Sequence, residues 1–115
     1  MNTIRQLKKK IRDNQYEIED IEQGFTFDNE NFLSFLIYEI AKKKIISEKI
    51  IQNLKSMALG ENDISNKSIG GIFTLKVTAC ATLLKLGIND EFNLLNNDEK
   101  EVVVRILDYQ DWKNI

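Results

Sequence analysis

The residue types that usually carry catalysis are nearly missing from this chain. It has no histidine and one cysteine, Cys80, so it lacks the parts of a Ser-His-Asp site, a Cys-His site or a Cys/His zinc site. Gly70 and Gly71 belong to no Walker or dinucleotide-binding fingerprint. Paired carboxylates remain, but they fall at exposed helix positions without a Glu-x-x-His motif. We therefore predict a non-enzyme with no catalytic residue, no metal and no cofactor, and interpret Cys80 as a small buried hydrophobe.

The distribution of charge is the more informative feature. Eight acidic residues and no lysine or arginine lie between positions 13 and 41, five basic residues precede that block, and five lysines follow it between positions 42 and 55. The net charge is only −2. An acidic protein is a poor general binder of nucleic acid, because phosphate contacts dominate that affinity. It is well suited to a basic protein partner, since complementary charge speeds encounter.

A tyrosine surrounded by carboxylates is the predicted binding surface. If Ile4 and Ile11 face the core of one continuous helix, Tyr16 lies on its outward face. Like charges three and four residues apart slightly destabilise an isolated helix, and such a tyrosine is typical of a binding hot spot. The alternative is a solvated face with an incidental tyrosine. The predicted partner-binding residues are Asp13, Tyr16, Glu17, Glu19, Asp20 and Glu22.

Apolar spacing predicts an all-α fold, with residues 1–115 as a single helical domain. The first helix carries a seam with spacings of three and four residues and ends at Gly24. This seam suits a helical hairpin or bundle, or a weak homodimer with Asn14 at its interface. The seam residues are Ile4, Leu7, Ile11, Asn14, Ile18 and Ile21.

The rest of the chain predicts a bundle of four to five helices. Residues 32–59 form either one long helix or two helices that meet near 45–47, and a polar loop over 61–71 follows. Residues 72–86 are apolar nearly all round and predict a buried central helix, which Gly87 stops. A short turn and a last helix capped by Asn97 complete the bundle, although its three consecutive valines also suit a strand.

No apolar run approaches the roughly 18 residues that a membrane span needs. The amino terminus has basic residues but no apolar h-region behind them. We therefore expect a cytoplasmic protein with no membrane contact.

Residues 39–55 support a second interpretation. Six residues match the positions of a helix-turn-helix motif, which in order are apolar, small, apolar in the turn, cap, apolar and apolar. They are Ile40, Ala41, Ile46, Ser47, Ile51 and Leu54. The segment resembles the version found in LuxR-type regulators, but it departs at Lys44, where the motif wants an apolar residue. The resemblance implies a recognition helix over 47–55 in the DNA major groove, with nearby lysines on phosphates. A small DNA-binding regulator is thus the alternative function, and a packed helix pair or one long helix is the structural alternative.

The chain also resembles bacterial immunity proteins, which neutralise a toxin by binding it. Residues 77–85 and 98–103 are distantly similar to the last two helices of pediocin-type immunity proteins. Our leading hypothesis is a non-enzymatic inhibitor that occludes the active site of a basic nuclease toxin. Its carboxylates would stand in for substrate phosphates, and Tyr16 would anchor the contact. A structural or phage-encoded adaptor that dimerises through the seam of the first helix is the third hypothesis.

Overall fold

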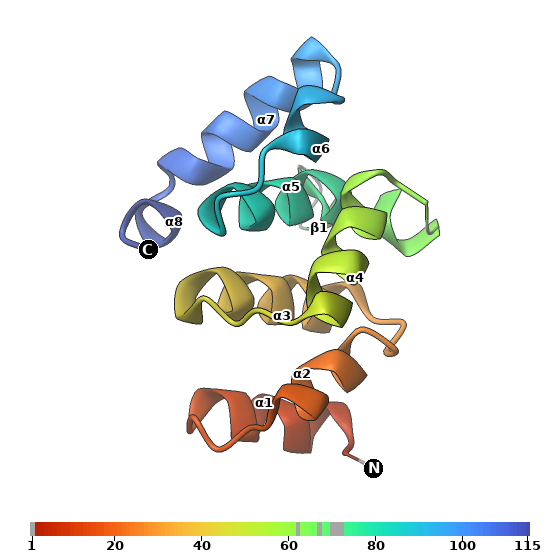
Figure 1. Ribbon diagram of the computed structural model, residues 1–115, viewed down its shortest axis with the longest axis vertical. Helices are drawn as coiled ribbons and strands as arrows, with labels where there is room; N and C mark the ends of the chain where they lie inside the picture. The colour runs from red at the N-terminus through yellow and green to blue at the C-terminus, as the bar shows by residue number, and fades with distance from the viewer. Residues whose placement is uncertain (1, 62, 67, 70–72) are drawn as a thin grey trace.

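The computed structural model describes residues 2–61, 63–66, 68–69 and 73–115. These residues are mostly helical (Figure 1), which confirms the all-α prediction. Their helices are α1 (Ile4–Arg12), α2 (Ile18–Gly24), α3 (Glu30–Lys43), α4 (Glu48–Ala58), α5 (Leu75–Lys85), α6 (Asp90–Asn93), α7 (Asn97–Asp108) and α8 (Gln110–Lys113). A 3₁₀ turn, η1 (Asp63–Asn66), and two antiparallel strands, β1 (Ser68–Ile69) and β2 (Phe73–Thr74), lie between α4 and α5.

The helices are stacked along the longest dimension of the molecule, which measures 40 × 29 × 27 Å (Figure 1). Helices α3, α5 and α7 pack on one another in succession, and α2, α4 and α6 do the same beside them. Helices α1 and α2 form the amino-terminal end of the stack. Each helix thereby buries its apolar face on the next, as in other helical bundles.

Helix α5 is the centre of the stack, as its apolar sequence predicts. It packs on α3, α4 and α7, and every residue from Leu75 to Leu83 except Lys76 is buried. It begins later than the predicted residue 72, because the Thr74 side chain caps it by accepting from the Val77 amide at 3.4 Å. Ile72 itself lies outside the described residues. The helix ends just before Gly87, whose φ of +85° suits a glycine.

The predicted single helix through the first seam is wrong. The chain leaves the helix after Arg12 and starts a new one at Ile18. Asn14 has a left-handed φ of 56°, and the amide of Gln15 donates to the Lys10 carbonyl at 2.8 Å, as in a Schellman-type ending. Asparagine tolerates this conformation better than other non-glycine residues. The polar member of the seam therefore marks a helix end.

The segment 32–59 forms two helices and not the single long helix that its sequence also allowed. Lys44 has a φ of 55°, and the Ile45 amide donates to the Ile40 carbonyl at 3.1 Å, so α3 ends in the same way as α1. The Ser47 hydroxyl then accepts from the Ile50 amide at 3.1 Å and caps α4. The short chain between these two caps turns α4 across α3 (Figure 1).

The last long helix, α7, is capped one residue earlier than predicted. The Asn96 side chain accepts from the Glu99 amide at 2.8 Å, and the Glu99 carboxylate accepts from the Asn96 amide at 3.3 Å, so the cap is not Asn97. The three valines 102–104 are helical. No helix in the described ranges combines the length and the apolar character needed to cross a membrane.

Candidate partner-binding surfaces

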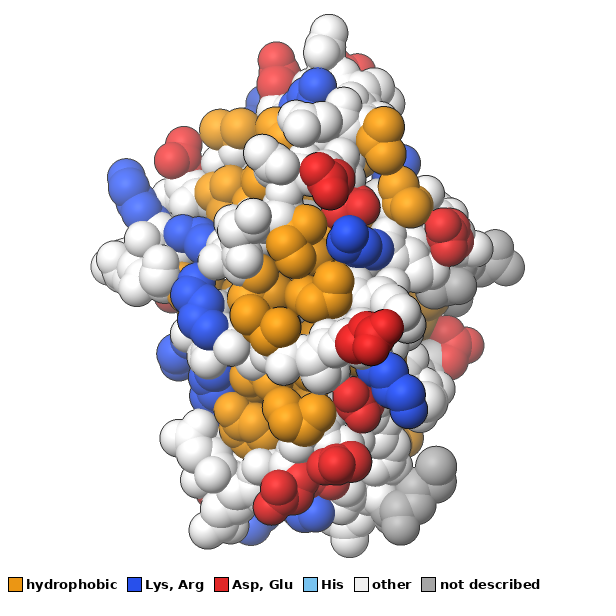
Figure 2. All heavy atoms as spheres, viewed as in Figure 1, with side chains coloured by type: hydrophobic (Ala, Val, Ile, Leu, Met, Phe, Trp, Pro, Cys, Tyr) orange, Lys and Arg blue, Asp and Glu red, His pale blue; other side chains and the backbone are white. Residues whose placement is uncertain are grey.

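The six predicted partner-binding residues lie at the end of α1, in the turn after it and in α2. Figure 2 shows acidic side chains at the lower end of the view, where these helices lie. Asp13, Glu17 and Glu19 are exposed, whereas Tyr16, Asp20 and Glu22 are partly buried. The turn thus keeps the predicted residues close together, although it does not place them on one helical face.

Asp20 and Glu22 fasten α2 to its surroundings. The Asp20 carboxylate accepts from the Glu17 amide and from the Asn2 side chain, both at 2.9 Å, and lies 3.7 Å from Lys10 Nζ. The backbone hydrogen bond from Glu17 and these partners lower the pKa of Asp20 despite its partial burial. The Glu22 carboxylate accepts from the Ser47 hydroxyl at 2.8 Å and so joins α2 to the cap of α4.

Tyr16 is not the outward anchor that a continuous helix predicts. Its side chain is partly buried and packs against the core, and Lys43 Nζ lies 5.5 Å from its ring centroid. Lys43 also donates a hydrogen bond to the Ile11 carbonyl at the end of α1, and its Nζ lies 3.5 Å from Glu39 Oε2. One lysine of α3 therefore holds both the end of α1 and the tyrosine after it.

Two glutamates of this surface lack an ion pair with a described residue, and one of them, Glu17, forms a capping box with Asp20 at the start of α2. Asp13 forms an exposed ion pair with Lys9 at 3.3 Å. Glu17 and Glu19 are exposed, and neither carboxylate is in an ion pair with a described residue. The negative charge of these two carboxylates is therefore not paired within the described part of the protein, and the exposed Lys9–Asp13 pair is a weak one.

The helix-turn-helix pattern over 39–55 fits the structure only in part. Ile40, Ala41 and Leu54 are buried, as the motif requires. Ile46 is 56% exposed, which is wrong for the turn position of the motif, and Ile45 is buried in its place. Of the lysines assigned to phosphates, Lys42, Lys44 and Lys49 are exposed, Lys55 is half-buried, and Lys43 is engaged inside the protein. The buried register is thus displaced from that of the motif.

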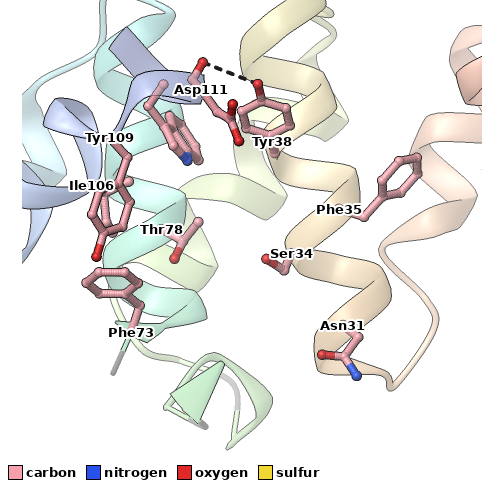
Figure 3. A pocket seen from close by; sticks show the side chains of 10 residues that line it. Asn31, Ser34, Phe35, Tyr38, Phe73, Thr78, Ile106, Tyr109 and Asp111 are labelled. Carbon is pink, nitrogen blue, oxygen red and sulfur yellow. Dashed lines mark hydrogen bonds between the residues drawn. The ribbon is translucent and has the colours of Figure 1, made fainter. Parts of the chain in front are cut away.

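A groove between α3, α5, α7 and α8 is a surface that the sequence analysis did not anticipate (Figure 3). Its volume is about 420 Å³. Aromatic rings from α3, from β2 and from the junction of α7 with α8 line it, namely Phe35, Tyr38, Phe73, Tyr109 and Trp112. The sequence signal was the concentration of Tyr109 and Trp112 at the end of α7 and in α8, but only the fold shows what they face.

Comparison of the chain with protein-family models, with curated proteins and with solved structures finds no significant match. The described residues also contain no group of three or more Cys, Asp or Glu side chains placed to hold a metal ion.

Proposed function

We propose that this chain is a non-enzymatic inhibitor of the immunity type, which binds a basic toxin and covers its active site. The observation that supports this most directly is the pair of exposed carboxylates on Glu17 and Glu19, which have no ion pair with a described residue. Lysine and arginine side chains that bind substrate phosphates form charge-assisted hydrogen bonds equally well with carboxylates. Such an inhibitor would occupy the phosphate-binding positions of a nuclease.

The supports of α2 explain how these carboxylates would be presented. Asp20 ties the start of α2 to Asn2, and Glu22 ties it to Ser47. A surface that is already ordered loses less conformational entropy on binding, so more of the contact energy appears as affinity. Tyr16 contributes through its exposed part, and its ring is held by Lys43. Charge then sets the association rate, while the buried contacts set the dissociation rate.

The test uses the product of the gene adjacent to the one that encodes this chain. That product is expressed from an inducible promoter in bacterial cells, with or without this chain, and growth is followed. We expect the neighbouring product to arrest growth and this chain to relieve the arrest. The Glu17→Lys/Glu19→Lys variant should lose that protection and slow association in surface plasmon resonance by about 10-fold or more.

A matched variant separates the position of the charge from its amount. Glu101→Lys/Asp108→Lys makes the same change in net charge on exposed positions of α7 and should protect as well as the unaltered chain. A neighbouring product that is harmless, or one whose toxicity this chain does not relieve, contradicts the function. Equal protection by both variants contradicts the assignment of the site to α2.

A further inference from the structure

Contacts between the aromatic rings that line the groove hold its shape. Tyr38 and Trp112 meet edge to face with centroids 5.2 Å apart, and Phe73 meets Tyr109 in the same way at 5.6 Å. The Tyr38 hydroxyl donates to the backbone carbonyl of Asp111 at 3.2 Å, which ties α3 to α8 (Figure 3). Burial and the charge of Asp111 raise the pKa of Tyr38, so its hydroxyl stays protonated at neutral pH.

Polar side chains lie among these rings on the α3 and α5 sides. Ser34 and Thr78 face each other across the groove (Figure 3), and the Thr78 hydroxyl is engaged with the Thr74 carbonyl at 2.9 Å. Asn31 is exposed at the start of α3. Its amide supplies both a donor and an acceptor, and the Ser34 hydroxyl can do the same. Side chains that both donate and accept can hydrogen-bond to the backbone of an extended chain.

Basic side chains of α1 lie beside the groove, against the ring of Phe35. Phe35 points away from the other rings (Figure 3), and Lys8 Nζ and Arg12 Cζ of α1 lie 5.5 and 5.4 Å from its ring centroid. Arg5 is exposed on the same helix, and it lines a separate hollow with Lys8, Arg12 and the Lys9–Asp13 ion pair. None of the three cations Arg5, Lys8 and Arg12 is in an ion pair with a described carboxylate. Asp111 of α8 is exposed and lines the groove beside Tyr38.

We propose that this groove binds an extended segment of a partner protein that carries an apolar side chain next to a run of acidic residues. The apolar side chain would lie against Tyr38, Tyr109 and Trp112, the backbone would bond to Asn31 and Ser34, and the acidic run would lie over the α1 cations. The charge of this partner is opposite to that of the proposed toxin, so the two proposals are independent.

A protein segment fits the groove better than a single-stranded nucleic acid. Bases bind by stacking on ring faces, but four of the rings already meet in edge-to-face pairs. The Asp111 carboxylate in the lining would repel a continuous phosphate backbone. A peptide whose acidic residues are confined to one side meets cations at one end only, which matches the charge asymmetry between α1 and α8.

The experiment is a selection from a phage-displayed library of random 12-residue peptides on the immobilised full chain. The peptides that are enriched are then synthesised, and their affinity is measured by fluorescence anisotropy. We expect enrichment of sequences with an aromatic or aliphatic residue flanked on one side by aspartate and glutamate. Ser34→Trp, which fills the groove, and Lys8→Glu/Arg12→Glu should each weaken binding by about 10-fold or more.

Controls assign the binding to this surface. Lys42→Glu/Lys49→Glu makes the same charge change at exposed positions outside the groove and should leave affinity within about 2-fold. All variants are first checked for native helicity by circular dichroism. No enrichment, enrichment of basic peptides, or peptide affinity unaffected by Ser34→Trp overturns the proposal. Binding of a 20-mer of oligo-dT that is lost in the same two variants would assign the groove to nucleic acid instead.

Discussion

Replacing Lys43 by methionine should destabilise the protein more than any other single change of a lysine on α3. The ammonium group lies 3.5 Å from Glu39 Oε2, and the two side chains are only 18% and 11% exposed. It also bonds to the Ile11 carbonyl at the end of α1 and lies against the Tyr16 ring. Methionine keeps most of the apolar stem, so the variant removes the charge and leaves Glu39 without its cation.

The size of the effect follows from the geometry of this pair. At 3.5 Å and an effective dielectric constant of 20, the attraction is about 5 kcal/mol before desolvation. Breaking a fully buried pair costs about 3–5 kcal/mol, and the residual exposure of both groups lowers that to about 2–3 kcal/mol. A 115-residue domain has about 6–17 kcal/mol of stability in total. The variant should therefore fold, with a melting temperature lower by about 10 °C.

Urea unfolding, followed by circular dichroism and by Trp112 fluorescence, measures this loss. Lys42→Met is the matched control, because Lys42 is the exposed neighbour of Lys43, and it should change stability by no more than about 0.5 kcal/mol. Glu39→Met/Lys43→Met removes both charges and should recover about 1–2 kcal/mol relative to Lys43→Met alone. Two results would show that Lys43 does not neutralise the charge of Glu39. One is a stability of Lys43→Met equal to that of its control, and the other is a loss of unfolding free energy in the double variant equal to the sum of the losses in the two single variants.

Three further outcomes follow from individual contacts. The Lys76 ammonium, 2.8 Å from Glu99, and the cap of α7 lower the pKa of Glu99 below its ordinary 4.5. The stability that Glu99 contributes above pH 4.5 should therefore be lost as the pH falls through the lowered pKa. Lys76→Met should reduce this loss in acid-unfolding curves. Burial raises the pKa of Cys80 to about 12, so a thiol reagent at about pH 8 should modify it only after unfolding in urea; rapid native reaction would contradict its burial. Glu91 Oε1 is buried with no hydrogen-bond partner in the described part of the chain, and Glu91→Met should raise the unfolding free energy by about 1 kcal/mol, whereas a loss of that size would reveal a stabilising role.

Local sequence signals predict the elements of this fold well. The central helix is recognisable because residues 75–83 are apolar or small nearly all round, which suits only a helix covered on every side. The helix starts are recognisable because Asn29 and Ser47 cap through their own side chains. Such signals act within one turn of helix, so they need no knowledge of the tertiary structure.

The missed features depend on contacts between distant segments. Asn14 suits a heptad seam as well as it suits a left-handed helix end. The helix end is stabilised by a hydrogen bond from Lys43 to the Ile11 carbonyl, 32 positions away in the sequence. The groove joins Tyr38 to Asp111 over 73 positions. Spacing along one helix carries no information about such pairs, so neither the break in the first helix nor the groove was predictable from apolar periodicity.

The charge pattern of the sequence changes its meaning once the helices are stacked. A basic segment followed by an acidic one suggests two faces of opposite sign, but Lys9 pairs with Asp13 at the end of α1, and Lys10 pairs with Asp20 across the turn to α2. The charge that remains unpaired around this turn lies on Glu17 and Glu19 on the acidic side, and on the α1 cations around Phe35 on the basic side. The exposed Lys9–Asp13 pair contributes little to stability. Substitution of the paired residue Asp20, which also accepts from Asn2 and from the Glu17 amide, should act mainly on stability. Substitutions at the unpaired residues should act mainly on binding and on its dependence on salt.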